Sequence, residues 1–265
     1  RWPPAWAGKS NMGGWFTIER IDGDTFAISE YAHWEQTHCY LLLGAQRALL
    51  LDTGLGVASL RAQVEILTHL PVTVASTHVH WDHIGGHGEF DRLAVHELER
   101  NWLDGHFPLP PQAVRQNLTA RPCPFPDGFD PAGYQVFQGP PQLVFQDGHR
   151  FDLGGRVVEA VHTHGHSPGH CCFYEPERRR LYAGDLIYKG CLDMFYPTTD
   201  PVQFLASVRK ISRLGVRQVL PGHHQLDIPA ALIPQVEAGL CRLERSGQLR
   251  QGAGVFDFGP FQLHL

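Results

Sequence analysis

The sequence has little of three features that would assign a protein to a class by themselves: paired cysteines, long apolar runs and clustered basic residues. Its six cysteines are scattered with no CxxC spacing, so neither a disulfide framework nor a cysteine zinc site is predicted, and a reducing, cytoplasmic compartment is favoured. No uninterrupted apolar stretch approaches the roughly 18 residues that a membrane span needs. The chain begins at Arg1 without an initiator methionine, which leaves a processed N-terminus open.

The charge balance argues against a nucleic-acid partner. The net charge is −5, whereas nucleic-acid-binding domains usually carry clustered basic residues. We expect the single basic run, at 178–180, to be a solvated hairpin turn. With 43% hydrophobic and 18% charged residues, the 265-residue chain has a globular composition and enough length for a substantial core.

Four metal-capable side chains lie within six residues: His78, His80, Asp82 and His83. Imidazole nitrogens and carboxylates are ligands that suit zinc and similar metals. His78 and His80 are two residues apart, so on an extended backbone both rings project to the same side. The preceding run 71–76 is apolar and β-branched, and reads as a buried strand. The pattern predicts a metal site at a strand end that can serve two adjacent ions, in preference to a solvated histidine-rich loop.

The remaining chain alternates strand-like runs with three stretches that are expected to be helical. Strands are expected at 15–21, 25–29, 39–43, 47–51, 72–77, 157–161, 171–174, 180–183 and 216–220. Helices are expected at 57–70, 201–214 and 229–245. This order suits two sheets packed face to face with helices outside.

A proline-rich segment interrupts this pattern, with nine prolines between Phe107 and Pro141. Proline at that density prevents a long helix or a central strand. The segment is either a surface excursion or a semi-rigid flap over the metal site, because long loops in compact domains are often lids.

Three further ligand-type residues follow later strands, each directly after a glycine: His166, Asp185 and His223. Together with the opening cluster they resemble the metallo-β-lactamase-fold hydrolase superfamily. The matching motifs are Leu51-Asp52-Thr53-Gly54, the HxHxDH run with Gly85-Gly86, the GHSPG segment at 165–169, Gly184-Asp185 and Gly222-His223. The resemblance implies an α/β fold of the four-layer αββα type, with the metals at one edge of the two sheets. We accordingly expect a single domain over residues 1–265, with a proline-rich insertion at about 105–141.

The resemblance also implies a ligand set. His78, His80 and His166 would hold the first metal, Asp82, His83 and His223 the second, and Asp185 would bridge both. Asp52 would orient a histidine ligand through its other ring nitrogen. In the second cluster His166 is the expected ligand, with His164 and His170 as alternatives. His164 departs from the family pattern, which commonly has proline there.

Two zinc ions, with iron or manganese as alternatives, would hold a bridging hydroxide that attacks a carbonyl carbon. Asp82 would accept or orient the water proton. Tyr188, three residues past Asp185, is expected to donate a hydrogen bond to the oxyanion or leaving group, unless it only packs in the loop.

With an aspartate in the bridging position, the chain resembles the thioesterase, lactonase and RNA-processing branches of the superfamily. The net negative charge disfavours RNA processing. Short motifs at 90–96, 145–148 and 184–188 resemble the metallo-β-lactamase-domain-containing-protein-2 type, which is associated with acyl-CoA thioester hydrolysis. The prediction is therefore a hydrolase of small-molecule thioesters, esters or lactones. The alternatives are an acyl-homoserine lactonase, a glyoxalase II-like or β-lactam hydrolase, a mononuclear iron persulfide dioxygenase, and a metal sensor without turnover.

Overall fold

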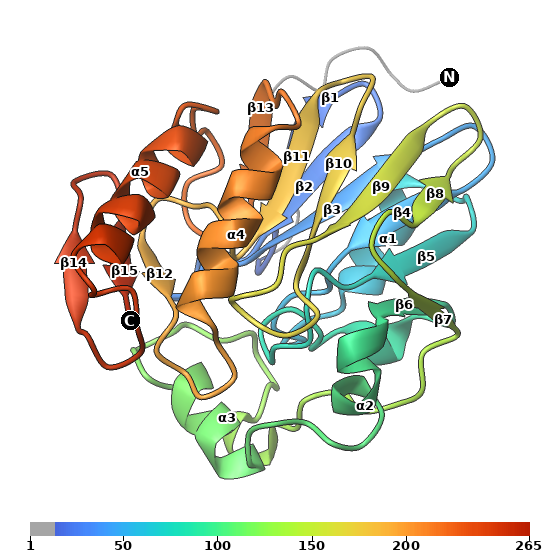
Figure 1. Ribbon diagram of the computed structural model, residues 1–265. Helices are drawn as coiled ribbons and strands as arrows, with labels where there is room; N and C mark the ends of the chain where they lie inside the picture. Colours follow the sequence, from blue (N-terminus) through green and yellow to red (C-terminus); the bar gives the residue numbers. More distant parts are fainter. Residues whose placement is uncertain (1–13) are drawn as a thin grey trace.

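Two β-sheets packed face to face form the centre of the computed structural model, which describes residues 14–265 (Figure 1). In the described chain the first sheet has the strand order β1 (Thr17–Asp22), β2 (Thr25–Ser29), β3 (His38–Leu43), β4 (Ala48–Leu51), β5 (Val72–Ala75), β6 (Leu93–His96) and β7 (Leu143–Phe145). The second sheet has the order β13 (Gln218–Pro221), β11 (Arg180–Gly184), β10 (Cys171–Glu175), β9 (Val157–His162) and β8 (Arg150–Asp152).

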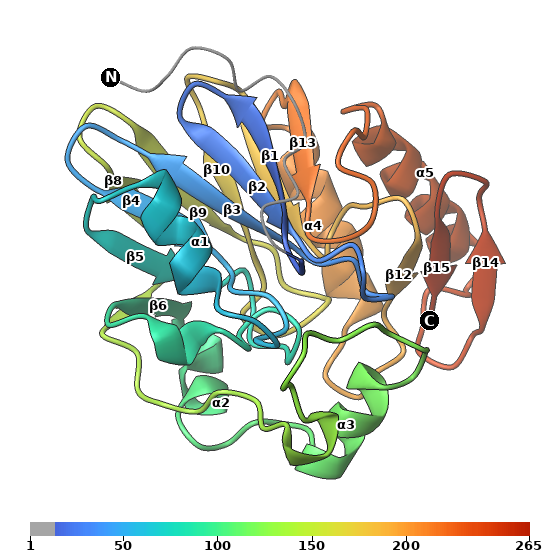
Figure 2. The same cartoon turned by 180° about the vertical axis from the view of Figure 1, so that it is seen from behind.

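Helices cover both outer faces. Helix α1 (Leu60–Leu67) lies over the first sheet, and α4 (Pro201–Ser212) and α5 (Leu232–Arg245) lie over the second (Figures 1 and 2). A small sheet of order β12 (Cys191–Asp193), β15 (Gln262–His264) and β14 (Val255–Asp257) lies beside α5. The expected four-layer αββα sandwich is confirmed. Among the described residues, no helix combines the length and the apolar character that a membrane crossing requires.

The sheets are held together by side chains that alternate along each strand. On β3, Tyr40 and Leu42 point into the core between the sheets, whereas Cys39 and Leu41 pack on the outer side. Both leucines are fully buried, and each contributes about 1.5–3 kcal/mol of hydrophobic stabilisation. A strand buried on both faces reads as a continuous apolar run, which explains the unbroken sequence at 39–43.

Most of the expected strands and helices are present, with bounds that differ by a few residues. The expected helix at 57–70 is shorter, because Ser59 caps α1 by accepting a hydrogen bond from Ala62 N and the chain becomes extended at Thr68. The strands that the sequence did not predict have only three or four residues, namely β6, β7, β8, β12, β14 and β15. Such short runs show too little alternation to be read as strands.

The prediction of a solvated basic turn at 178–180 is wrong for Arg180. This residue begins β11 and is buried. Its Nη2 lies 2.7 Å from Asp22 Oδ2, and its Nη1 donates to Thr25 Oγ1 at 3.1 Å. The neighbouring Arg178 forms a two-pronged contact with Asp24, at 2.6 Å for each oxygen. The acidic turn between β1 and β2, on the other sheet, therefore neutralises two of the three arginines of the basic run.

The proline-rich segment contains helix α3 (Pro111–Leu118) and the short 3₁₀ turn η3 (Pro131–Gly133), and follows the 3₁₀ turns η1 (His87–Glu89) and η2 (Glu97–Glu99) and helix α2 (Arg100–Leu103). It is fixed to the rest of the fold from two sides. Trp34 Nε1 donates to Asn117 O at 3.1 Å, and Tyr134 Oη donates to Leu55 O at 2.7 Å. The Phe125 ring also stacks on Trp15, with centroids 6.0 Å apart. These contacts make the segment part of the packed structure, and its role as a flap stays a prediction.

Candidate metal centre

The loops that follow five strands meet at one edge of the sandwich. Strands β4 and β5 run parallel, and β9, β11 and β13 share one direction, because β10 is antiparallel to both β9 and β11 while β13 is parallel to β11. Their carboxyl ends carry the predicted site residues Asp52, His78, His80, Asp82, His83, His166, Asp185 and His223. Except for the half-buried His80, all of these side chains are buried.

The first predicted ligand group comes together around a single point. His80 Nδ1 lies 3.0 Å from His78 Nε2 and 3.1 Å from His166 Nε2, and the three ligand atoms are all within 4.8 Å of one another. Three ring nitrogens that face one another cannot all be satisfied by the protons they carry, since each neutral imidazole has one donor and one acceptor. A cation between them satisfies all three lone pairs, so the donor set fits a metal.

Those imidazoles are in the state that a metal requires. Burial, assisted by the neighbouring rings, holds the pKa of His78 and His80 well below the usual range. Burial likewise lowers the pKa of His166. The three rings are therefore neutral near pH 7, which leaves their lone pairs available for coordination.

The second predicted group contains Asp82, His83 and His223. The two Nε2 atoms are 3.1 Å apart, and Asp82 Oδ2 lies 3.6 Å from that of His83 and 3.5 Å from that of His223. This set of two imidazoles and a carboxylate is again confined to 4.8 Å.

Asp185 lies between the two groups. Its Oδ2 is 3.4 Å from His166 Nε2 and 3.2 Å from His223 Nε2, and its Oδ1 is 3.2 Å from His83 Nε2. Burial opposes ionisation of this carboxyl, but the imidazoles, above all His223 and His83, hold its pKa well below the usual range. Oδ1 is buried and makes no hydrogen bond of acceptable geometry among the described residues. A buried, ionised and incompletely satisfied carboxylate between two ligand groups is what a bridging position requires.

Asp52 orients the rings of His83 and His78, whereas the sequence analysis expected it to orient a single histidine. Its Oδ2 accepts a hydrogen bond from His83 Nδ1 at 2.8 Å and another from Thr77 Oγ1 at 2.7 Å. Because the Thr77 hydroxyl donates to Asp52, it accepts from His78 Nδ1, 3.0 Å away. In both histidines Nδ1 is thereby engaged, and Nε2 is the nitrogen directed toward the predicted ligand groups.

Backbone carbonyls orient two more of the predicted ligands. His166 Nδ1 donates to Asp193 O at 3.2 Å, and His223 Nδ1 donates to Glu35 O at 2.9 Å. In both rings the proton on Nδ1 leaves Nε2 facing Asp185. These carbonyls carry no sequence signal, since every residue has one.

Glu99 is a supporting residue that the sequence analysis missed. It is fully buried, and its carboxylate joins the two histidine loops. One oxygen accepts from the backbone N–H of Val79 at 2.5 Å, between two predicted ligands. The other oxygen accepts from Gly169 N at 2.8 Å and from the Ser167 hydroxyl. Nothing in the local sequence distinguishes this glutamate from the exposed Glu97 two residues earlier.

His170, an alternative ligand in the sequence analysis, instead holds the loop of Asp185, the predicted bridging residue. Its Nε2 accepts the backbone N–H of Asp185 at 3.0 Å, and its Nδ1 contacts Thr163 Oγ1 at 2.8 Å. Gly184, just before Asp185, has φ +50°, and a Cβ there would lie 2.6 Å from His170 Nε2. Glycine is therefore required for the close approach of the two loops.

Other histidines, including the alternative ligand His164, do not join the predicted ligand groups. His164 is half-buried and stacks on His162 at 5.9 Å. His96 also stacks on His162, at 4.2 Å. His87 is enclosed between the hydroxyls of Thr53 and Ser76.

Tyr188 lies beside the centre, but its hydroxyl is engaged elsewhere. Its ring centroid is 5.5 Å from that of His223, and its hydroxyl donates to the carbonyl of Cys191. Burial and the Asp185 carboxylate hold the pKa of this phenol well above the usual range. To stabilise an oxyanion, as the sequence predicts, the hydroxyl would have to leave Cys191.

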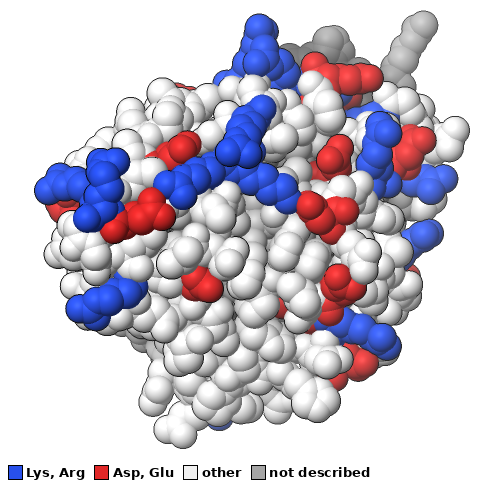
Figure 3. Space-filling view, in the orientation of Figure 1, with Lys and Arg blue, Asp and Glu red and all other residues white. Residues whose placement is uncertain are grey.

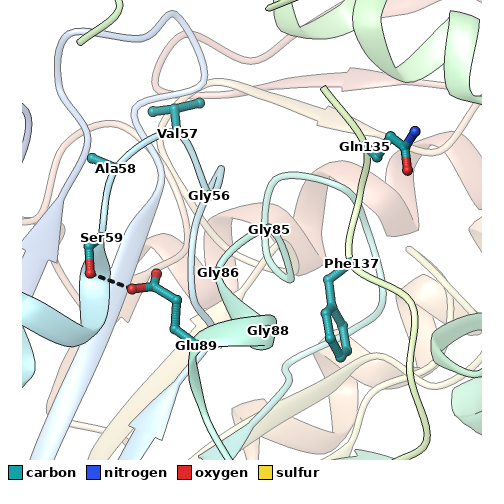
Figure 4. A pocket seen from close by; sticks show the side chains of 10 residues that line it. All are labelled: Gly56, Val57, Ala58, Ser59, Gly85, Gly86, Gly88, Glu89, Gln135 and Phe137. Carbon is teal, nitrogen blue, oxygen red and sulfur yellow. Dashed lines mark hydrogen bonds between the residues drawn. The ribbon is translucent and has the colours of Figure 1, made fainter. Parts of the chain in front are cut away.

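A cavity of about 470 Å³ lies next to the loop that follows His83 (Figure 4). Its wall includes Gly56 and Gly85, whose backbones approach so closely that a Cβ on Gly56 would lie 2.3 Å from Gly85 O. The carboxylate in this cavity, Glu89, accepts from Ser59 Oγ at 2.5 Å and from Leu60 N at 3.0 Å. Glu89 thus already occupies the N-terminus of α1, and its contacts fix the loop that follows His83 against this helix.

Comparison with known proteins gives a consistent family. The sequence model of the metallo-β-lactamase superfamily matches residues 33–223. The human acyl-coenzyme A thioesterase MBLAC2 is 29% identical over 229 residues, which are 79% of this chain and 81% of that protein. The atrochrysone carboxyl ACP thioesterase of Aspergillus fumigatus is 31% identical over 198 residues, 71% of this chain and 50% of that protein.

A solved structure supports the same assignment. The metallo-β-lactamase family protein TTHA1429 from Thermus thermophilus is similar with a TM-score of 0.58 and 26% identity, over 79% of this chain and 76% of that chain. The family implies metal ions at the site, and the donor set described above fits them. The match over most of the chain, with the αββα fold, shows that this protein belongs to the metallo-β-lactamase superfamily and is a hydrolase.

Proposed function

We propose that the protein is a dinuclear metal-dependent hydrolase of acyl thioesters, with zinc as the metal. The position of Asp185 carries this proposal, because its carboxylate faces His166 on one side and His83 and His223 on the other. Two divalent ions in such a site supply an activated hydroxide at neutral pH and polarise the carbonyl that it attacks.

The residues of the chain have distinct tasks in this proposal. His78, His80 and His166 hold one ion, and Asp82, His83 and His223 hold the other. Asp82 additionally accepts the proton of the attacking water through its carboxylate. The Tyr188 hydroxyl is proposed to leave the carbonyl of Cys191 and to donate a hydrogen bond to the negative charge that develops on the substrate oxygen.

The thioester substrate is proposed from the two thioesterase relatives and from two cations beside the ligand loops. Lys189 directly follows Tyr188, and its Nζ contacts Gln225 Oε1 at 3.1 Å, two residues after His223. The exposed Arg121 lies over the Trp34 ring at 5.5 Å. Burial lowers the pKa of His224, and the charges of His223 and Arg121 add to that shift. Both cations are suited to bind the phosphates of coenzyme A.

The charge distribution favours a neutral acyl group. On the face of the molecule drawn in Figures 1 and 3, Lys and Arg side chains gather mainly in the upper half, which includes α4 and α5. The lower part, over α3 and the nearby loops, shows few charged side chains.

The test is a hydrolysis panel with metal quantification. Purified protein is assayed with an acyl-CoA, the same acyl chain on N-acetylcysteamine, an acyl-homoserine lactone, S-lactoylglutathione and a cephalosporin. We expect at least two metal equivalents per chain and the highest kcat/KM for the acyl-CoA. The variant Arg121→Gln/Lys189→Gln should raise KM for the acyl-CoA and leave the N-acetylcysteamine thioester unaffected, because that substrate carries no phosphate. A single iron with no hydrolysis would support the dioxygenase alternative and overturn the proposal.

A further inference from the structure

A second cluster of metal-type side chains lies beside the hydrolytic centre, on the small three-stranded sheet. Cys191 and Asp193 are two residues apart on β12, so their side chains leave the strand on the same face, while Leu192 between them is buried in the core. Strand β15 runs parallel to β12 and places His264 directly opposite Asp193.

The three side chains are already in mutual contact. His264 Nδ1 lies 3.0 Å from Asp193 Oδ1, and the Cys191 thiol lies beside the same carboxyl. One sulfur, one oxygen and one nitrogen atom fall within 4.8 Å of one another. The His264 ring is also held in place by Phe195, whose ring stacks on it with centroids 4.0 Å apart.

The simpler interpretation is a histidine–aspartate pair that joins two strands. A half-exposed pair of this kind contributes about 0–1 kcal/mol to stability, and it does not explain why a thiol lies beside it. The combination of thiolate, imidazole and carboxylate is instead a donor set for zinc and softer ions. Partial exposure of all three residues gives an ion access from solvent and lets water complete its coordination. We propose that Cys191, Asp193 and His264 form a separate binding site for a zinc-class divalent ion.

Asp193 links this site to the hydrolytic centre. Its carboxylate belongs to the proposed site, while its backbone carbonyl accepts the hydrogen bond from His166 Nδ1 at 3.2 Å. An ion bound at Cys191, Asp193 and His264 would therefore fix the peptide that orients His166, and would tie the strand β15 to β12.

Cobalt titration of the metal-stripped full chain tests the site. Cobalt(II) bound by a thiolate gives an intense near-ultraviolet charge-transfer absorption, and the ligand set of the hydrolytic centre contains no cysteine. The band therefore reports the proposed site whether or not the hydrolytic centre is dinuclear. We expect the band in the wild type, its loss in Cys191→Ser, and at least about tenfold weaker cobalt binding in His264→Ala.

The control is Cys241→Ser, which removes another half-buried thiol, on α5, and should keep the band. Circular dichroism of each variant shows whether it is folded. The proposal is overturned if the folded wild type gives no charge-transfer band at saturating cobalt, or if Cys191→Ser keeps the band.

Discussion

Asp82 differs from the other proposed ligands because it is expected both to hold a metal and to accept a proton. Asp82→Asn keeps the shape and one ligand oxygen but removes the charge that accepts a proton. We expect hydrolysis to fall by about 10²–10⁴-fold while most of the bound metal is retained. Steady-state kinetics with metal analysis on the same sample checks this. Parallel loss of metal and activity would show that Asp82 only holds metal.

Glu99 supports the centre without being among its proposed ligands. In Glu99→Gln one of the three donors that face the carboxylate would meet an amide N–H instead of an oxygen. Leaving a buried donor unpaired costs about 1–3 kcal/mol, so the free energy of unfolding should fall by that amount, and metal affinity should fall about tenfold. Denaturant unfolding and metal competition measure the two effects.

Glu97→Gln is the matched control, because Glu97 is exposed and its carboxylate accepts a hydrogen bond from Gln146 Nε2 at 2.7 Å on the surface. Its effect on stability should stay within about 0.5 kcal/mol. If both substitutions have the same small effect, Glu99 does not hold the histidine loops together.

His87 makes stability depend on pH. Burial lowers its pKa to about 3, so below about pH 6.5 the unfolded chain takes up a proton that the folded chain does not. Stability from this group is complete above about pH 6.5 and falls as the pH decreases toward about 3. Between about pH 7.5 and 5.5 the wild type should lose about 1.4 kcal/mol more than His87→Gln. Denaturant unfolding at both pH values measures the difference, and equal losses in the two proteins would refute the assignment.

At the scale of elements, the close approach of the β9–β10 and β11 loops depends on Gly184. Gly184→Ala adds left-handed backbone strain of about 1–2 kcal/mol and also pushes against His170, which holds Asp185. We expect loss of metal binding and of activity. Gly155→Ala has a similar φ, +76°, with open space around the added carbon. It should lose comparable stability and keep activity; equal inactivation of both would contradict the role of the loop contact.

The sequence predicts the elements that carry the centre better than it predicts their supports. Strand β5 and the following histidines were recognisable because residue spacing and apolar runs are local features. Glu99 was not, because its partners Val79 and Gly169 lie far from it along the chain and are backbone groups. The burial of Arg180 was missed for the same reason, since Asp22 belongs to the opposite sheet.

At the scale of the whole molecule, each proposed ligand group takes residues from both sheets. His78 and His80 follow β5 of the first sheet, and His166 follows β9 of the second. Hydrogen bonds also join the two sheets near the centre: Tyr40 Oη donates to Pro221 O at 2.6 Å, and His38 N donates to Gly222 O at 2.8 Å. The site is therefore preorganised by the packing of the sheets, and bound metal should reinforce that packing.

The most direct test of the account is anomalous diffraction from crystals of the metal-loaded protein, measured on both sides of the zinc absorption edge. At the hydrolytic centre the account predicts two zinc peaks about 3.5–4 Å apart, one beside His78, His80 and His166 and one beside Asp82, His83 and His223, with Asp185 between them. The separate site proposed at Cys191, Asp193 and His264 would give a further peak away from this pair. A single peak at the hydrolytic centre of fully loaded, active protein would contradict it.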